Sequence, residues 1–167
     1  MIHHVSIPAQ EPRAAAEALA ELMGGKCYPF PGPVPGAFMA VSGDAHGTMI
    51  EVYPEDAVFR PGIGEDEVVA STGKPIGEHA FHLLLSVPVD AATVSRIGTR
   101  MGWRTQRCGR GPKATGEVLF EVIELWLDNR LMIEVATPDL VPAYTELFRF
   151  DKLDAFFERM GAMAPAE

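Results

Sequence analysis

The sequence is short of cysteine, of basic residues and of long apolar runs. Cys27 and Cys108 are too few for a disulfide framework, and reduced thiols are expected. No apolar run reaches the roughly 20 residues that cross a membrane, and the first segment, MIHHVSIPA, lacks the parts of a signal peptide. Lysine and arginine number 14 against 23 acidic residues, and the net charge of −9 argues against nucleic acid as a partner. We therefore expect a cytoplasmic protein with no membrane or nucleic-acid partner.

A pattern of segments repeats after roughly 80 residues. In the first copy we expect a strand at 2–9, a helix at 11–23, and strands near 27–30, 38–42 and 48–53. In the second copy we expect a strand at 79–88, a helix at 90–102, and strands near 103–108, 118–127 and 130–138. Asp90 is the expected N-cap of the second helix, and an Asp128-Asn129 turn is expected before the last strand. The sequence thus predicts an α+β fold made of two βαβββ modules.

The limits of these modules follow from composition. Proline, glycine and acidic residues concentrate just after the first module, which indicates a linker. After the second module, apolar residues recur at helical spacing, and this tail is expected to cover the core or a partner subunit. We expect a first module at 1–54, a linker at 55–78, a second module at 79–138 and a C-terminal helical tail at 139–167, with 1–138 forming one domain.

Two near copies of one short stretch, MIEVYP and MIEVATP, each place a glutamate between apolar residues. Because side chains alternate along a strand, Glu51 faces away from its Ile and Val neighbours, toward the side to which His4 of the first strand also points. The second module repeats this arrangement with His82 and Glu134. If the outer strands of each module are neighbours and the modules face each other, two imidazoles and two carboxylates converge.

Two histidines and two glutamates suit a divalent transition metal, because imidazole favours Zn, Fe or Ni and carboxylate oxygen suits harder ions such as Mn. A dication also offsets two carboxylates that are costly to bury. Four protein ligands leave room for water or substrate when the metal is five- or six-coordinate. The alternative is a hydrogen-bonded polar network without metal. His3, His46 and His79 have the wrong strand parity or lie in a loop, and they are not expected ligands.

Basic residues cluster in the second module. Two interpretations stay open: a solvated helix face followed by a hairpin, or a local attraction for an anionic small substrate. Four of these residues, after the helix, are the candidates for binding such a substrate: Arg104, Arg107, Arg110 and Lys113.

The paired modules, with HHVSI, MIEV, HLLLSV and MIEV at their outer strands, resemble the vicinal oxygen chelate superfamily, which includes glyoxalase I, extradiol dioxygenases and bleomycin-resistance proteins. The resemblance covers residues 2–137. It implies an open, half-barrel-like cup with a divalent metal (Zn, Ni, Fe, Mn or Co) on its inner surface. It also implies that Glu134 or Glu51 acts as the catalytic base. The metal ligands that it implies are His4, Glu51, His82 and Glu134.

Three functions follow from this resemblance. The leading expectation is a glyoxalase I-like isomerase or lyase acting on a small carbonyl or carboxylate compound, in a homodimer. Pro8 and Glu55 stand where similar bacterial glyoxalases often carry Arg and Asn that contact glutathione, which argues against glutathione as cosubstrate. The alternatives are a non-haem Fe(II) extradiol-type dioxygenase and a metal-free binding protein. The aromatic residues that could line a groove in such a binding protein are Phe30, Phe38, Tyr53, Trp103, Phe120 and Trp126.

Overall fold

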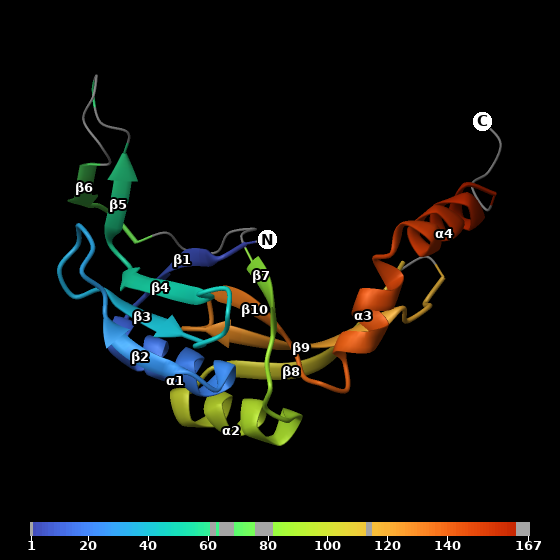
Figure 1. Cartoon of the computed structure of the whole chain (residues 1–167), viewed down its shortest axis with the longest axis horizontal. Coiled ribbons are helices and arrows are strands. Elements are labelled where there is room, and N and C mark those ends of the chain that lie inside the picture. Colours follow the sequence, from blue (N-terminus) through green and yellow to red (C-terminus); the bar gives the residue numbers. More distant parts are fainter. Residues whose placement is uncertain (1, 61–62, 64–68, 76–81, 113–114, 163–167) are drawn as a thin grey trace.

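The structure is a computed structural model, and it describes residues 2–60, 63, 69–75, 82–112 and 115–162. The first module contains β1 (His4–Ala9), α1 (Pro12–Met23), β2 (Lys26–Pro29), β3 (Phe38–Val41) and β4 (Met49–Pro54). The second contains β7 (His82–Ser86), α2 (Ala91–Met101), β8 (Arg104–Arg110), β9 (Phe120–Leu127) and β10 (Leu131–Ala136). Figure 1 shows both modules with the chain coloured from blue to red. The predicted α+β fold with two βαβββ modules is confirmed.

Each module forms one open sheet with the same topology. The strand orders are β1-β4-β3-β2 and β7-β10-β9-β8, and in each sheet the first strand runs parallel to the last. The turn before β10 is built as expected, since Asp128 and Asn129 both adopt the left-handed conformation, with φ of 51° and 55°. Two consecutive left-handed residues match the twist of a tight hairpin.

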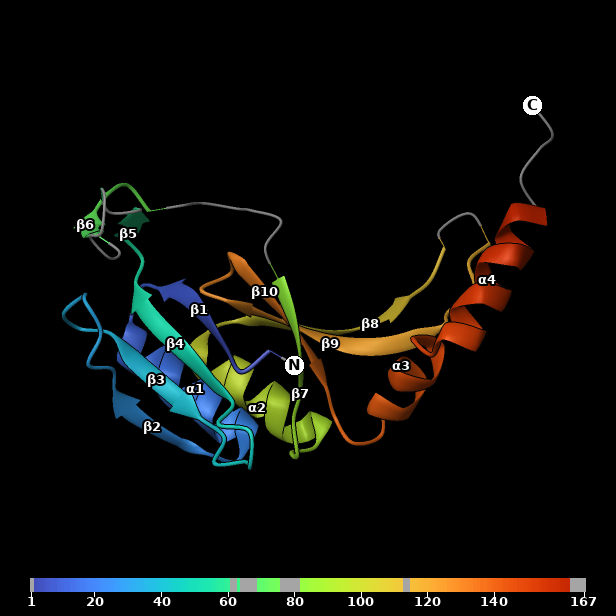
Figure 2. The same cartoon turned by 45° about the horizontal axis from the view of Figure 1, so that its top comes forward.

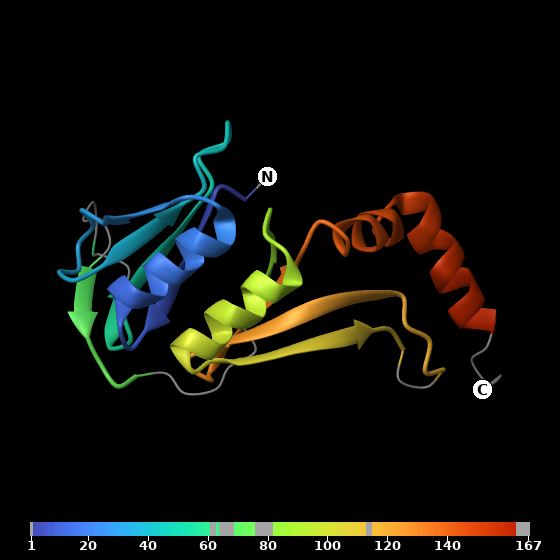
Figure 3. The same cartoon turned by 90° about the horizontal axis from the view of Figure 1, so that it is seen from below.

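Local signals explain where the two helices begin and end. Pro12 occupies the first turn of α1, and Asp90 caps α2 by accepting a hydrogen bond from the backbone N–H of Thr93, as predicted. Gly24 and Gly102 end the helices in the left-handed conformation, with φ of 65° and 68°. Both helices cover the same side of the molecule (Figure 3), where they bury apolar residues such as Leu19 against the sheets. The opposite faces of the sheets are left open for polar side chains.

The segment between the modules holds a hairpin that the sequence did not predict. β5 (Ala57–Arg60) pairs antiparallel with β6 (Val69–Thr72), within the expected linker 55–78. Phe59 of this hairpin packs edge-on against Tyr53 of β4, at 4.9 Å between ring centroids. The hairpin is therefore anchored to the first module by an aromatic contact.

The C-terminal tail forms two helices rather than one, α3 (Val141–Leu147) and α4 (Phe150–Ala162). They extend away from the modules along the far ends of β8 and β9 (Figure 2), and α3 has no buried residue. Tyr144 of α3 contacts Phe120 of β9, with ring centroids 5.2 Å apart. Among the described residues, no helix is both long and apolar enough to span a membrane.

Candidate functional site

The two predicted half-sites occupy the same positions in the two sheets. In the first sheet, His4 pairs with Met49, and Glu51 follows two residues later on β4. In the second sheet, His82 pairs with Met132, and Glu134 again follows two residues later. The repeat therefore extends from the sequence to the register of the strands.

Glu51 is a buried carboxylate held by hydroxyl groups. It is 7% exposed, and its Oε2 accepts hydrogen bonds from Ser6 Oγ at 2.7 Å and from Tyr53 Oη at 3.2 Å. Its Oε1 faces Nε2 of His4 at 3.9 Å, and the His4 side chain is half exposed. The two hydroxyls fix one carboxylate oxygen, so the other is presented to the imidazole.

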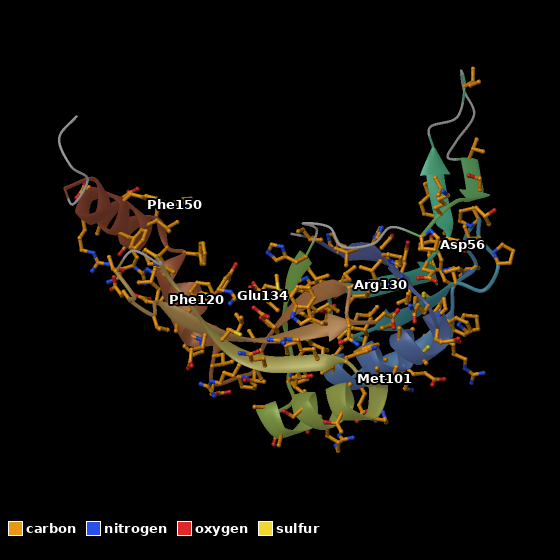
Figure 4. All side chains as sticks on the ribbon, turned by 180° about the vertical axis from the view of Figure 1, so that it is seen from behind. Asp56, Met101, Phe120, Arg130, Glu134 and Phe150 are labelled. Atoms are coloured by element: carbon orange, nitrogen blue, oxygen red, sulfur yellow. The ribbon has the colours of Figure 1, made fainter. Side chains whose placement is uncertain are left out.

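Glu134 has a different environment. Arg110 of β8 reaches across β9 and donates from Nε to Oε1 of Glu134 at 2.8 Å. The same guanidinium donates from Nη2 to Oε1 of Glu124 at 2.8 Å, and Trp126 Nε1 donates to the other oxygen of Glu124 at 3.0 Å. Figure 4 shows the position of Glu134 in the concave middle of the molecule. One arginine thus neutralises part of a carboxylate pair.

These surroundings shift pKa values in directions that follow from burial and charge. Burial, together with the charge and hydrogen bond of Glu51, raises the pKa of Tyr53 to about 12. Partial burial of Glu124 opposes ionisation, but hydrogen bonds from Arg110 and Trp126 outweigh it and leave its pKa below the ordinary value. Glu124 therefore remains a carboxylate at neutral pH.

His4 and His82 come together at one cavity. A volume of about 440 Å³ opens at the beginnings of β1, β4 and β7, and both imidazoles line it. Ionic side chains are missing from its described lining, which also contains His3, Thr48 and Tyr144. The apolar lining residues are Ile2, Val5, Met49, Ile50, Leu83, Leu84 and Leu85.

The four expected metal ligands are only partly brought together. His4 and Glu51 form a pair, and Oε1 of Glu51 presents its lone pairs toward the imidazole. Within the described ranges, no three His, Cys, Asp or Glu residues lie close enough together to hold a metal. The donor types fit a divalent metal, and His4 with Glu51 is the part of the set that is already assembled. Binding by all four residues requires His82 and Glu134 to approach that pair.

The four basic substrate candidates do not form one patch. Strand alternation puts Arg104 and Arg110 on the inner face of β8 and Arg107 on the other face, where it bonds to Glu121 at 2.6 Å. Arg104 donates to Gln106, and Arg110 is held by the two glutamates. Lys113 lies outside the described residues. Each of the three described arginines already bonds to another side chain, so none is free to bind an anionic substrate without breaking that bond.

Sequence reasoning missed Ser6 and Glu124 as parts of the site, and it proposed Tyr53 only as an aromatic residue lining a groove, not as a hydrogen-bond donor to Glu51. The sequence did contain a signal for them, because each side chain points to the same face of the sheet as a predicted ligand. Ser6 pairs with Glu51, and Glu124 pairs with Glu134. The six aromatic residues proposed for a groove are absent from the described lining of the cavity between β1 and β7. Trp103, for example, is 5% exposed in the core.

Glu55, which stands where similar glyoxalases often carry an Asn that contacts glutathione, has a partner within this chain. Glu55, after β4, bonds to Arg130 of the second module, with Oε2 and Nη1 2.6 Å apart. This ion pair crosses the junction between the two modules.

No family model matches the sequence, and no curated protein matches it. Solved structures resemble the chain. A lactoylglutathione lyase from Agrobacterium tumefaciens is 14% identical, with a TM-score of 0.46, over 83% of this chain and 93% of that one. A possible glyoxalase from Bacillus cereus is 19% identical, with a TM-score of 0.41, over 81% and 96%. A glyoxalase/bleomycin resistance protein/dioxygenase from Alicyclobacillus acidocaldarius is 12% identical, with a TM-score of 0.41, over 82% and 90%.

The strand order of both sheets provides the topological evidence for the fold. Each sheet follows the order first, last, third, second within its module, with one helix after the first strand. In both sheets the first and last strands of the module are neighbours, as the sequence analysis assumed when it placed each histidine beside a glutamate. The chain has a fold of two paired βαβββ modules.

Proposed function

We propose that the chain is a metal-dependent isomerase or lyase acting on a small substrate with a carbonyl or two adjacent oxygens. The observation that carries this proposal is the pair His4 and Glu51, in which a buried carboxylate presents one oxygen to an imidazole. The same residue types stand in the same register in the second sheet, as His82 and Glu134. A His and a Glu at matching positions of both sheets support a shared site more strongly than either pair would alone.

His4, Glu51, His82 and Glu134 would hold the metal, and the bound metal would supply Lewis-acid polarisation of a substrate carbonyl. The hydroxyls of Ser6 and Tyr53 hold Oε2 of Glu51, which orients its other oxygen. A glutamate oxygen, of Glu134 or Glu51, accepts the proton that is removed beside the carbonyl and returns it to the neighbouring carbon.

The substrate that fits best has an apolar body. The cavity lined by both histidines has the size of a small-molecule site, since such sites span about 300–1,000 Å³, and its described lining carries no fixed charge. Glutathione is a poor match, because Glu55 is engaged by Arg130. The anionic substrate expected from the basic cluster is the alternative, and Arg104 and Arg110 are the inner-face arginines that would meet it.

An extradiol-type dioxygenase is the alternative enzyme. Its metal would be held by two histidines and one carboxylate, the set used by non-haem Fe(II) oxygenases, which here means His4, His82 and Glu134. Glu51, the buried carboxylate that faces His4, would be a fourth ligand and counts against this alternative. This candidate predicts oxygen consumption with catechols in the presence of ferrous iron.

The test is elemental analysis of the purified protein after incubation with Zn²⁺, Ni²⁺, Mn²⁺ or Fe²⁺. The expected result is one metal per chain and a marked loss in His4→Ala, Glu51→Gln, His82→Ala and Glu134→Gln. His46→Ala is the matched control, since His46 is an exposed histidine of a loop. Undiminished metal in both His4→Ala and Glu134→Gln would falsify the site, and absence of metal from the unaltered protein would favour a metal-free binding protein.

Activity is tested on methylglyoxal, with and without glutathione, and on phenylglyoxal as a substrate with a larger apolar body. Turnover that does not require glutathione is expected, with a lower KM for phenylglyoxal. Equal turnover by His4→Ala would contradict a role for the metal pair in catalysis.

A homodimer is part of the same proposal. The C-terminal helices support it, because Phe148, Phe150 and Phe157 are 47%, 86% and 65% exposed. Exposed aromatic residues in such numbers are typical of an association surface. Figure 4 shows Phe150 far from the concave middle of the molecule. Light scattering should give the mass of two chains, and Phe150→Asp with Phe157→Asp should give the mass of one.

A further inference from the structure

The cavity that His4 and His82 share also receives a residue from the C-terminal tail. Tyr144 of α3 is part of its lining, although α3 has no buried residue and the tail extends away from the two modules (Figure 2). The other described residues of the lining lie on or beside β1, β4 and β7. The tail therefore contributes to a site that is otherwise built by the two modules.

The ring of Tyr144 is held by two other aromatic residues. Its centroid lies 5.2 Å from that of Phe120 on β9 and 4.5 Å from that of Phe148, which follows α3. Phe120 and Phe148 also contact each other, with centroids 6.1 Å apart. Contacts of this kind favour specific ring geometries, so the hydroxyl is fixed together with the ring.

The cavity is elongated along β7. Four successive residues of this strand, 82–85, line it, which corresponds to a length of about 10 Å at the rise of a strand. His82 stands at the beginning of this stretch and Leu85 at its end. A ligand that fills the cavity would therefore lie along the strand, with one end at His82.

The strand register places Tyr144 toward the other end. Leu85 is aligned, through β10, with Ile123 of β9. Phe120 precedes Ile123 on β9, which runs antiparallel to β10 and therefore to β7, so Phe120 lies beyond the level of Leu85, away from His82. Because Tyr144 contacts Phe120, the tyrosine and His82 are separated along the cavity.

Two hydroxyl groups belong to the described lining, those of Thr48 and Tyr144. The side chain of Thr48 bonds to Asp44, and its backbone N–H donates to Oδ1 of the same carboxylate at 3.1 Å. The hydroxyl of Tyr144 has no hydrogen-bond partner within the described part of the chain. A phenol both donates and accepts, and it usually has a partner when it is covered. Tyr144 is therefore the hydroxyl that a bound ligand would use.

We propose that Tyr144 is a specificity-determining residue, and that the cavity takes a neutral, elongated carbonyl compound with a second hydrogen-bonding group about 10 Å from the carbonyl. This inference rests on the proposed function, which places the carbonyl at the histidines. The apolar side chains between the two ends hold the body of the substrate. The second group is neutral, because the described lining has no ionic side chain to pair with a charge.

The test compares two ketones that differ in one hydroxyl group, benzylacetone and its para-hydroxy derivative. In the derivative, the hydroxyl and the carbonyl stand at opposite ends of an apolar body. NMR titration measures binding to the full chain as purified, and again in EDTA, so that the result does not depend on a metal. The unaltered protein should bind the hydroxy ketone about two- to tenfold more tightly, the range of one net hydrogen bond. The para-carboxy derivative should bind more weakly than either.

Tyr144→Phe removes the hydroxyl and keeps the ring that contacts Phe120 and Phe148. The two ketones should then bind with nearly equal affinity, because the hydroxy ketone loses its partner, and unchanged binding of benzylacetone shows that the cavity is intact. Tyr28→Phe is the matched control, since Tyr28 is 44% exposed on β2 and lies outside the described lining. Thr48→Val tests the other hydroxyl, and it should keep the preference for the hydroxy ketone.

The outcomes separate this inference from the proposed function. Equal binding of the two ketones by the unaltered protein, or a preference that persists in Tyr144→Phe, overturns the inference and leaves the proposed function standing. Binding of neither ketone also overturns it, while metal content and turnover decide the proposed function separately. A preference that disappears in Tyr144→Phe and persists in Tyr28→Phe and Thr48→Val supports the inference. If the protein then holds no metal and turns over no carbonyl compound, only the proposed function fails.

Discussion

Ser6 and Glu51 lie opposite each other on neighbouring parallel strands, and the serine hydroxyl donates a 2.7 Å hydrogen bond to Oε2 of the glutamate. In the second sheet the position opposite Glu134 is Leu84, which has no hydroxyl to offer. The repeat therefore preserves the acids and changes what holds them. The carboxylate of the first module is therefore oriented by hydroxyl groups, and the carboxylate of the second module is held by a guanidinium.

Replacement of Ser6 by alanine should lower the free energy of unfolding by about 1 kcal/mol, since it removes a hydrogen bond to a buried carboxylate while Tyr53 still donates to the same oxygen. Urea denaturation measures this change. Ser86→Ala, at an exposed position of β7, serves as control and should have little effect. Equal stability of the two variants would mean that the Ser6 hydroxyl does not hold Glu51.

Tyr53 should ionise late in an alkaline titration. Its pKa is raised to about 12 by burial and by the neighbouring charge and hydrogen bond of Glu51. Difference absorbance of the phenolate measures this step, and Tyr53→Phe identifies it. Glu51→Gln removes the charge, so it should move the step to lower pH. An unchanged step in Glu51→Gln would show that the carboxylate does not face this phenol.

The positions of the two histidines and two glutamates were predictable because strand alternation is a local property. A period of two residues places Glu51 on the face opposite Ile50 and Val52, and His4 on the face opposite Val5. The strand register then confirmed that the first and last strands of each module are neighbours, as the sequence analysis assumed. Convergence of all four side chains at one metal is not tested by that register and remains a prediction.

The partners of Arg110 could not be predicted, because they depend on how three strands are aligned. The register pairs Arg110 with Phe120 and Glu124 with Glu134, and the long side chain of Arg110 reaches both acids across β9. Without that alignment, Arg110 is only one member of a basic cluster in the sequence. The β5–β6 hairpin was missed for a related reason, since glycine and proline dominate the composition around its short strands.

Gly98 provides a prediction in which packing opposes helix propensity. Alanine is favoured over glycine in a helix by about 1 kcal/mol, yet a Cβ at this position of α2 would lie 1.9 Å from Oγ1 of Thr105 and 3.2 Å from the carbonyl oxygen of Trp103. Gly98→Ala should therefore destabilise the protein, by about 1–3 kcal/mol. Thermal unfolding measures the effect.

Two further variants test that reason. Thr105→Ala removes the nearer obstacle, so the double variant should recover part of the loss, which a double-mutant cycle quantifies. Ser95→Ala, on the exposed side of the same helix, should be neutral or slightly stabilising. If Gly98→Ala proves more stable than the unaltered protein, α2 does not pack closely on β8.

The contact between the two helices should make stability depend on pH. Glu21 of α1 accepts hydrogen bonds from Arg100 at 2.7 Å and from Arg96 at 2.8 Å, both on α2. These bonds, with Arg100 the larger contributor, lower the pKa of Glu21 below its ordinary value of 4.5. A lowered pKa in the folded state means that the stabilisation is fully present above about pH 4.5 and is lost as the pH falls through the folded value.

Glu21→Gln should thus lower the free energy of unfolding at pH 7, by less than about 1 kcal/mol because the three side chains are partly exposed and screened by water. The difference from the unaltered protein should shrink as the pH falls below 4 and should also shrink in high salt. Denaturant titrations across this pH range measure it, with Glu17→Gln as a control whose partner, Arg13, lies on the same helix. A constant difference between pH 7 and pH 3 would mean that the charge of Glu21 does not join the two modules.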